Sequence, residues 1–183
     1  MKTYLKNISK ILIVFFISLS LTTFLSSCKK DSSNPADAGT GGNGGGGGNS
    51  GSMTLNGDGW SNKVITITTA ASTYGVSAQL TAINIICSDG ITIIAYSTGN
   101  QTGTFNFTND PTQGGGITLT SGTGQTAKYY LSKENAGTVT LSSYGGVGQT
   151  VSGSISGTIV NAATQEEVTI NGSFNATRTV DVP

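Results

Sequence analysis

The strongest structural constraint in this sequence is an alternation of apolar and polar residues with a period of two near its C-terminal end. Val151, Ile155 and Ile159 share one side of the chain with Gly153 and Gly157. Residues 167–177 repeat the pattern, again with a glycine among the apolar positions. Successive side chains of a strand point to opposite faces, whereas a helix repeats every 3.6 residues. The pattern therefore predicts two strands, each with one apolar face.

Short polar connections indicate that strands close in sequence pair with each other. Residues 161–166 separate the two C-terminal strands and are polar enough and long enough for a hairpin turn. Asp89 and Gly90 separate two further apolar runs, and an Asp-Gly pair tolerates the positive φ angles of a tight hairpin. We therefore expect antiparallel neighbours in a meander.

Extended to the rest of the chain, the same reasoning predicts an all-β domain over residues 53–183. The 27 glycines and the many Ser and Thr residues favour turns and strands over helices. One apolar face per strand suits an antiparallel β-sandwich or a partly open barrel, largely a meander, and closure into a calyx is a further form. The expected strands cover residues 53–55, 63–69, 77–87, 91–97, 103–107, 117–120, 127–132, 137–143, 151–160 and 167–177.

A glycine-rich segment precedes this domain. Residues 31–52 are Ser, Asn, Asp, Ala, Pro and Gly for the most part, with five glycines in a row over residues 44–48. Residues of these types cannot form a hydrophobic core, so the segment is predicted to be a disordered linker. A chain of this length has an average end-to-end distance of about 25 Å. A phosphate-binding loop is the alternative, but no strand precedes the glycines and no suitable helix follows. We therefore interpret residues 28–52 as a flexible tether.

The first 27 residues have the layout of an export signal. Lys2, Lys6 and Lys10 precede a strongly apolar run over residues 11–17 and a milder stretch up to Leu25. The strongly apolar part is shorter than the about 20 residues that a membrane-spanning helix needs. Residues 1–27 are therefore predicted to be a signal peptide.

The end of this segment, Leu25-Ser26-Ser27-Cys28, resembles the lipobox of bacterial lipoproteins. The resemblance implies cleavage before Cys28 and acylation of its sulfur, so that two or three acyl chains anchor the mature protein to a membrane. The following Lys29-Lys30-Asp31 is similar to the short charged signal of surface lipoproteins. We expect the bacterial outer membrane, at its periplasmic face or at the cell surface. An ordinary secretory cleavage near Ser26 and Ser27 is the alternative.

The residue inventory argues against an enzyme. The chain has no histidine, which removes Ser-His-Asp and Cys-His arrangements and the commonest metal ligand. Glu166 and Glu167 are adjacent at a strand start and point to opposite faces, so they cannot flank one glycosidic bond. Cys87 follows three isoleucines and is expected in the core. We predict no catalytic residue, no metal and no cofactor, and the net charge of zero favours no nucleic-acid partner.

Aromatic residues are the remaining candidates for ligand contact. Trp60, Tyr129 and Tyr130 are candidate stacking residues for a sugar, although aromatic side chains more often pack in a core. Tyr129 and Tyr130 are adjacent in an expected strand and must point to opposite faces, so one of them should reach solvent. The Asn-Gly-Asp-Gly sequence at residues 56–59 is interpreted as a turn that positions Trp60.

Three motifs carry a resemblance to a known family: LNGDGW at residues 55–60, SGSISGT at 152–158 and NGSF at 171–174. Together with GTFNF at 103–107 they resemble a family of uncharacterised Bacteroidota lipoproteins with a C-terminal all-β domain. The likeness covers residues 53–177, and Ile159 departs from the aromatic residue that this family has after Gly-Thr. The resemblance implies an all-β lipoprotein and no catalytic residue.

These observations favour a membrane-anchored, non-enzymatic binding or interaction module at the cell envelope. Its partner would be a glycan or a protein, in addition to the membrane held through the lipid on Cys28. Two alternatives remain: a structural envelope lipoprotein without a small-molecule ligand, and a calyx that carries an apolar ligand among its isoleucines.

Overall fold

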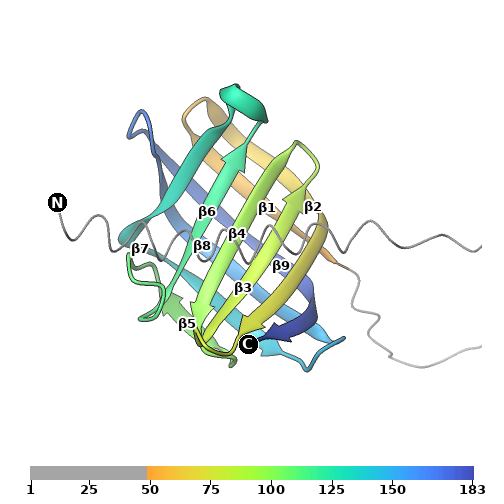
Figure 1. The fold of residues 1–183 in the computed structure, drawn as a ribbon. Helices are drawn as coiled ribbons and strands as arrows, with labels where there is room; N and C mark the ends of the chain where they lie inside the picture. Colours follow the sequence, from red (N-terminus) through yellow and green to blue (C-terminus); the bar gives the residue numbers. More distant parts are fainter. Residues whose placement is uncertain (1–48) are drawn as a thin grey trace, which may run out of the picture.

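The computed structural model describes residues 49–183, which form an all-β domain (Figure 1). The expected signal peptide, Cys28 and most of the expected tether lie outside the described residues. The first strand begins at Ser50, three residues before the expected domain boundary at 53. In chain order the elements are β1 (Ser50–Gly57), β2 (Trp60–Gly75), β3 (Leu80–Cys87), β4 (Ile91–Thr98), β5 (Gly103–Asn106), β6 (Gly115–Ser121), the 3₁₀ turn η1 (Gly124–Thr126), β7 (Lys128–Tyr144), β8 (Thr150–Asn161) and β9 (Glu167–Val182).

Eight of these strands close into an antiparallel barrel. Hydrogen-bonded neighbours follow the order β7-β6-β4-β3-β2-β1-β9-β8, and β8 pairs with β7 to complete the ring. The all-β fold and the largely meander topology are confirmed. Of the forms considered, the structure has the barrel, and the barrel is closed. Closure depends on the long-range β1–β9 pairing, which runs from Ser50 and Asn175 to Asn56 and Thr169.

The individual strands follow the alternation in the sequence, but several bounds differ. β2 and β9 are longer than the expected strands 63–69 and 167–177, and two further differences concern β7 and β3. β7 covers two expected strands, 127–132 and 137–143, because it pairs with β8 on both sides of a register shift between Ser132 and Gly137. β3 begins at Leu80 because the preceding Gln79 has a φ of 50° and lies in a turn. The hairpin at Asp89-Gly90 is confirmed, and Gly90 has the expected positive φ of 68°.

Below the start of β1, its two neighbours β2 and β9 pair directly with each other and complete the barrel wall. β1 separates β2 from β9 over the upper part of the barrel in Figure 1. Beyond Ser50, β2 and β9 pair in parallel, from Ala71 and Thr177 to Gly75 and Val182. Ser50, the first residue of β1, therefore lies partway along the barrel wall and not at either end of the barrel.

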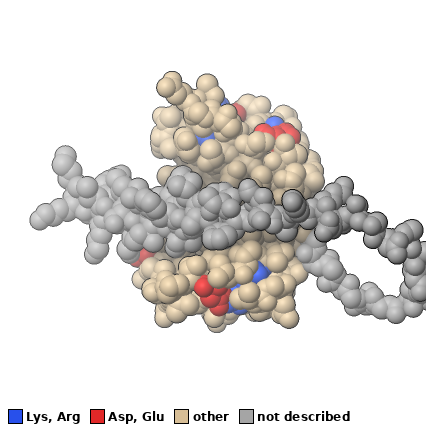
Figure 2. Space-filling model, turned by 45° about the vertical axis from the view of Figure 1, so that its right-hand side comes forward, with Lys and Arg blue, Asp and Glu red and all other residues tan. Residues whose placement is uncertain are grey.

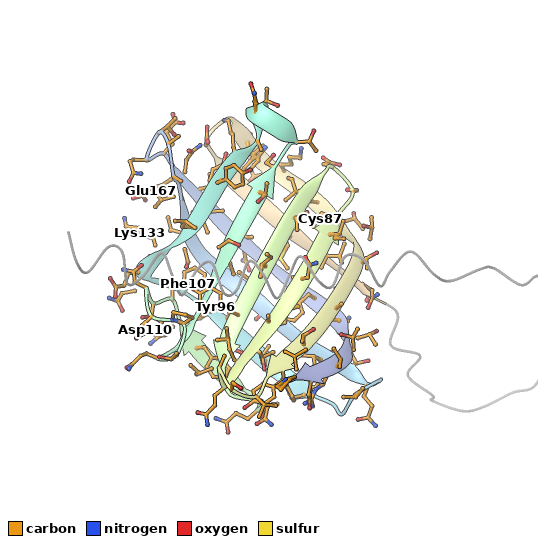
Figure 3. All side chains as sticks on the ribbon, viewed as in Figure 1. Cys87, Tyr96, Phe107, Asp110, Lys133 and Glu167 are labelled. Carbon is orange, nitrogen blue, oxygen red and sulfur yellow. The ribbon has the colours of Figure 1, made fainter. Side chains whose placement is uncertain are left out.

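β5 lies outside the ring and fills a seam between β6 and β7. It pairs with the later part of β7, on the side where β6 pairs with the earlier part. The next residue, Phe107, is fully buried, and its ring occupies the space that side chains at Gly137 and Gly157 would need (Figure 3). Tyr96 lies at the same seam, and its hydroxyl donates a hydrogen bond of 3.2 Å to the carbonyl oxygen of Thr108. The two aromatic residues thus seal the place where β6 and β7 part.

The barrel interior holds one continuous apolar core. Ten buried isoleucines of the described residues pack with larger side chains such as Phe107, Phe174 and Met53. Glycines make room for the largest of these, since a Cβ at Gly153 would lie 2.8 Å from the Phe174 ring. Interiors of eight-stranded barrels are just wide enough for side chains to fill. The isoleucines expected to line a calyx therefore pack against one another in the core.

Candidate functional site

A buried carboxylate lies at the upper end of the barrel. Asp58 is the central residue of the turn between β1 and β2, flanked by Gly57 and Gly59. All three residues have positive φ, 114°, 45° and 83° in chain order, and such backbone conformations favour glycine and are tolerated by aspartate. The turn brings the Asp58 side chain over the barrel end, where only 6% of it remains exposed.

Asp58 accepts three hydrogen bonds from the opposite side of the barrel. The Tyr130 hydroxyl donates to Oδ2 at 2.6 Å, and the Asn161 amide nitrogen donates to the same oxygen at 2.9 Å. Lys128 Nζ donates to Oδ1 at 2.9 Å. Hydrogen bonds to a charged acceptor are about twice as strong as neutral ones. The turn is thereby fastened across the barrel end to β7 and β8.

The electrostatics of this group follow from its geometry. The hydrogen bond from Tyr130, then those from Lys128 and Asn161, hold the pKa of Asp58 far below its usual range. Burial, and then the hydrogen bond to Asp58, raise the pKa of the Tyr130 hydroxyl. Asp58 is therefore ionised and Tyr130 neutral at physiological pH. The pair forms a stable closure in which neither group is poised to exchange a proton.

Trp60 completes the closure. Its ring lies 5.4 Å from the Tyr130 ring, centroid to centroid, with the two planes tilted by 37°. It is partly buried and packs against the core. Tilted aromatic pairs at this distance contribute about 0.5–1.5 kcal/mol beyond the area they bury. The turn at residues 56–59 does position Trp60, as the sequence predicts.

The predicted stacking residues do not share one face. Trp60 and Tyr130 come together at the barrel end, and Tyr130 is fully buried. Tyr129 points outward and is 49% exposed, which confirms the prediction that the two adjacent tyrosines face opposite sides. The expected lipid attachment site, Cys28, lies outside the described residues.

A second polar closure lies at the lower end of the barrel. Arg178 in β9 binds both carboxylate oxygens of Asp181 through its Nη2, at 2.7 and 2.8 Å, and donates from Nη1 to the carbonyl oxygen of Gly145. The guanidinium carbon lies 4.8 Å from the centre of the Tyr144 ring, a cation–π contact. The Tyr144 hydroxyl lies 2.8 Å from Thr81 Oγ1. These contacts join β3, β7 and β9 across the barrel.

Sequence reasoning missed the structural roles of Asp58 and Arg178. The Asn-Gly-Asp-Gly signal did indicate a turn, but the partners of Asp58 are 70 or more residues away. Both oxygens of Asp58 accept hydrogen bonds from protein donors. Within residues 49–183 no group of three His, Cys, Asp or Glu side chains is arranged to hold a metal ion.

The outer wall carries few charges, and most of them are paired. Lys63 binds Asp89 at 2.8 Å, and Lys133 binds Glu167 at 2.6 Å. On the face drawn in Figure 2, blue and red side chains lie in small mixed groups on a surface that is otherwise tan. The largest exposed apolar side chains of β7 are Tyr129 and Leu131, the latter 42% exposed and paired with Val160 of β8. The wall therefore has no large region of one charge sign among the side chains visible there.

Comparisons with family models, with curated proteins and with solved structures found no match for this chain. Among residues 49–183, no helix has the length and apolar character required to cross a membrane.

Proposed function

We propose that this chain is a lipid-anchored lipoprotein of the bacterial outer membrane whose barrel is a non-enzymatic module that binds a glycan or a protein. The observation that carries the proposal is that the barrel interior is filled by a single apolar core while both ends are closed by polar contacts. The surface left for a partner is therefore the outer wall with its connecting turns.

The placement of the polar groups supports a binding role over catalysis. Asp58, the most perturbed carboxylate, is held by three protein donors at a position that is nearly fully buried. Cys87 is buried in the core, and burial raises the pKa of its thiol to about 11. A nucleophile or general base needs access to a substrate and a pKa near the working pH. Neither group meets both requirements.

Anchoring rests on the lipobox-like sequence that ends at Cys28. In this proposal the acylated Cys28 holds the protein on the outer membrane, at the periplasmic face or at the cell surface, and the tether lets the barrel move away from the lipid. The test is Cys28→Ser in the full chain. Labelled palmitate should no longer be incorporated and the protein should leave the membrane fraction. Unchanged labelling and fractionation would refute the anchor.

Binding is tested separately with the full chain carrying Cys28→Ser, displayed to glycan and protein arrays. Retention of a glycan or a protein ligand is the expected result. Absence of binding to both arrays would argue for the second candidate, a structural envelope component. That candidate is favoured by the aromatic residues, because Trp60, Tyr74, Tyr96, Tyr130 and Tyr144 are all partly or fully buried. The packed isoleucine core counts against the calyx.

A further inference from the structure

Over four successive rows, three neighbouring strands present an outer surface of small uncharged polar side chains. The registers of β1, β9 and β8 align their outward residues in rows that run across the three strands. Two central rows are Thr54–Asn171–Ser156 and Ser52–Ser173–Ser154.

Rows of the same character flank these two. Above them lie Asn56, Thr169 and Thr158, and below them Ser50, Asn175 and Ser152. None of the residues in the four rows is buried. We call the four rows the polar face; it contains Ser, Thr and Asn and no other residue type.

The polar face is ordered by its own hydrogen bonds at the lower row. Ser152 Oγ donates to Asn175 Oδ1 at 2.7 Å, and the Asn175 amide nitrogen donates to Ser50 Oγ at 3.0 Å. Within a row, neighbouring residues on adjacent strands are about 4.8 Å apart. Successive rows, two residues apart along a strand, are separated by about 6.7 Å. The face therefore presents hydroxyl and amide groups at regular intervals on a rigid wall.

The row above the polar face is Leu131–Val160–Glu167, in which Glu167 is ion-paired with Lys133, and Tyr129 lies one row further along β7. Two residues beyond Thr158, Val160 pairs with Leu131 of β7, and the backbone of Ala162 donates to the carbonyl oxygen of Tyr129 at 2.8 Å. The exposed Tyr129 ring thus lies at the upper end of the same wall. A tyrosine offers an apolar ring face together with a polar tip, as a stacking residue for a sugar requires.

The polar face carries no charged side chain, and this favours some classes of partner over others. Nucleic acids and anionic lipids are held by Lys and Arg, which the face lacks. Protein interfaces depend on a core of aromatic, Met and Arg anchors, and about 800 Å² per partner. The exposed apolar side chains near the face are Tyr129 and Leu131 on one side and Val64, which pairs with Thr54, on the other. These separate side chains fall well short of such a core. A neutral polysaccharide matches the face, because sugar hydroxyls, like those of Ser and Thr, both donate and accept hydrogen bonds.

We infer that the polar face, together with Tyr129 above it on β7, binds a neutral polysaccharide. The inference rests on the proposed function and names its ligand class. The ligand chain lies across β1, β9 and β8, with one sugar ring stacked on Tyr129. A periodic, uncharged ligand fits the periodic, uncharged face.

The test is affinity electrophoresis of the full chain carrying Cys28→Ser in native gels that contain a neutral α-glucan, a neutral β-glucan or a mannan. A gel with polygalacturonate supplies the anionic comparison. The block variant Ser156→Ala/Asn171→Ala removes hydrogen-bonding groups from one row. Its matched control, Thr92→Ala/Thr120→Ala, removes two outward side chains that pair between β4 and β6. Thermal unfolding of each variant verifies that the fold is kept.

Retardation by at least one neutral polysaccharide is the expected result. Two lost hydrogen bonds of about 0.5–1.5 kcal/mol each should weaken binding by the block variant about tenfold, and Tyr129→Ala should weaken it as well. The control pair should bind like the parent chain. Retardation by no neutral polysaccharide, retardation by polygalacturonate alone, an equal effect of the control pair, or capture of a protein in its place would each overturn the inference. Palmitate labelling is independent of this assay, so a failure here leaves the lipid anchor standing.

Discussion

The hydroxyl of Tyr130 lies 2.6 Å from the carboxylate of Asp58, and this contact joins two opposite sides of the barrel. Asp58 belongs to the turn between β1 and β2, whereas Tyr130 belongs to β7. Around the ring, β7 is three strands from β1 in one direction and four strands from β2 in the other. The contact therefore fixes the first hairpin of the domain to the rest of the barrel.

Replacing Asp58 by Asn should destabilise the barrel. The variant keeps the shape of the side chain, but its amide NH₂ group replaces one carboxylate oxygen and would face either the Lys128 donor or the donors of Tyr130 and Asn161. Loss of hydrogen bonds to a charged group should lower the free energy of unfolding by about 2–3 kcal/mol. Equilibrium urea unfolding of the full chain carrying Cys28→Ser measures this. Asp89→Asn, which removes an exposed ion pair with Lys63, is the control and should have little effect. Equal effects of the two variants would contradict a special role for Asp58.

The contribution of Asp58 should also depend on pH in a defined direction. Its pKa is lowered in the folded state, chiefly by the hydrogen bond from Tyr130, while an unfolded aspartate titrates near about 3.9. Its contribution to stability is therefore complete above the unfolded pKa and is lost as the pH falls below it, toward the lower folded pKa. The difference in unfolding free energy between the parent chain and Asp58→Asn should be constant between about pH 7 and 5 and smaller at about pH 3. A difference that does not change with pH would show that the carboxylate charge contributes nothing.

The seam between β6 and β7 gives a third prediction. Gly157 lies beside Gly137 on the neighbouring strand, and an added Cβ would lie 2.6 Å from the Gly137 Cα and against the Phe107 ring. Gly157→Ala should therefore overpack the core and cost about 1–3 kcal/mol of stability. Gly75→Ala is the matched control, because its Cβ would lie 3.6 Å from the Ala78 Cβ, an ordinary contact. Thermal unfolding compares the two, and similar midpoints for both variants would disprove the proposed fit between Phe107 and the glycines.

The sequence predicted the local parts of this fold and missed its long-range parts. The alternation over residues 151–160 and 167–177 depends only on neighbours in sequence, so the last hairpin and its apolar face are confirmed. The hairpin turn at Asp89-Gly90 is likewise encoded by two adjacent residues, and Gly90 has the expected positive φ. Closure of the barrel depends on β1 pairing with β9, more than 100 residues later, and no local pattern encodes that contact.

The candidate site shows the same division. Adjacency alone predicted that Tyr129 and Tyr130 point to opposite faces, but which of them is buried depends on the register of β7 with β6 and β8. The hydrogen bonds of Asp58 depend on where β7 and β8 end relative to the first turn. The polar face could not be predicted from the sequence, because its rows combine residues of β1 with residues about 100 positions later in β8 and β9.

Cys87 supplies a chemical probe of the closed barrel. It faces the core, is almost fully buried, and has a thiol pKa raised by burial, and then by the charge of Asp89, to about 11 from an ordinary value of 9.0. A shift of this size lowers the thiolate fraction near pH 8 about a hundredfold, and only the thiolate is nucleophilic. In the full chain carrying Cys28→Ser, alkylation by iodoacetamide should therefore be at least about a hundredfold slower than for a free thiol. It should accelerate in urea with the same midpoint as the loss of structure. Rapid alkylation of Cys87 in the native protein would mean that the barrel opens far more often than its two polar closures allow.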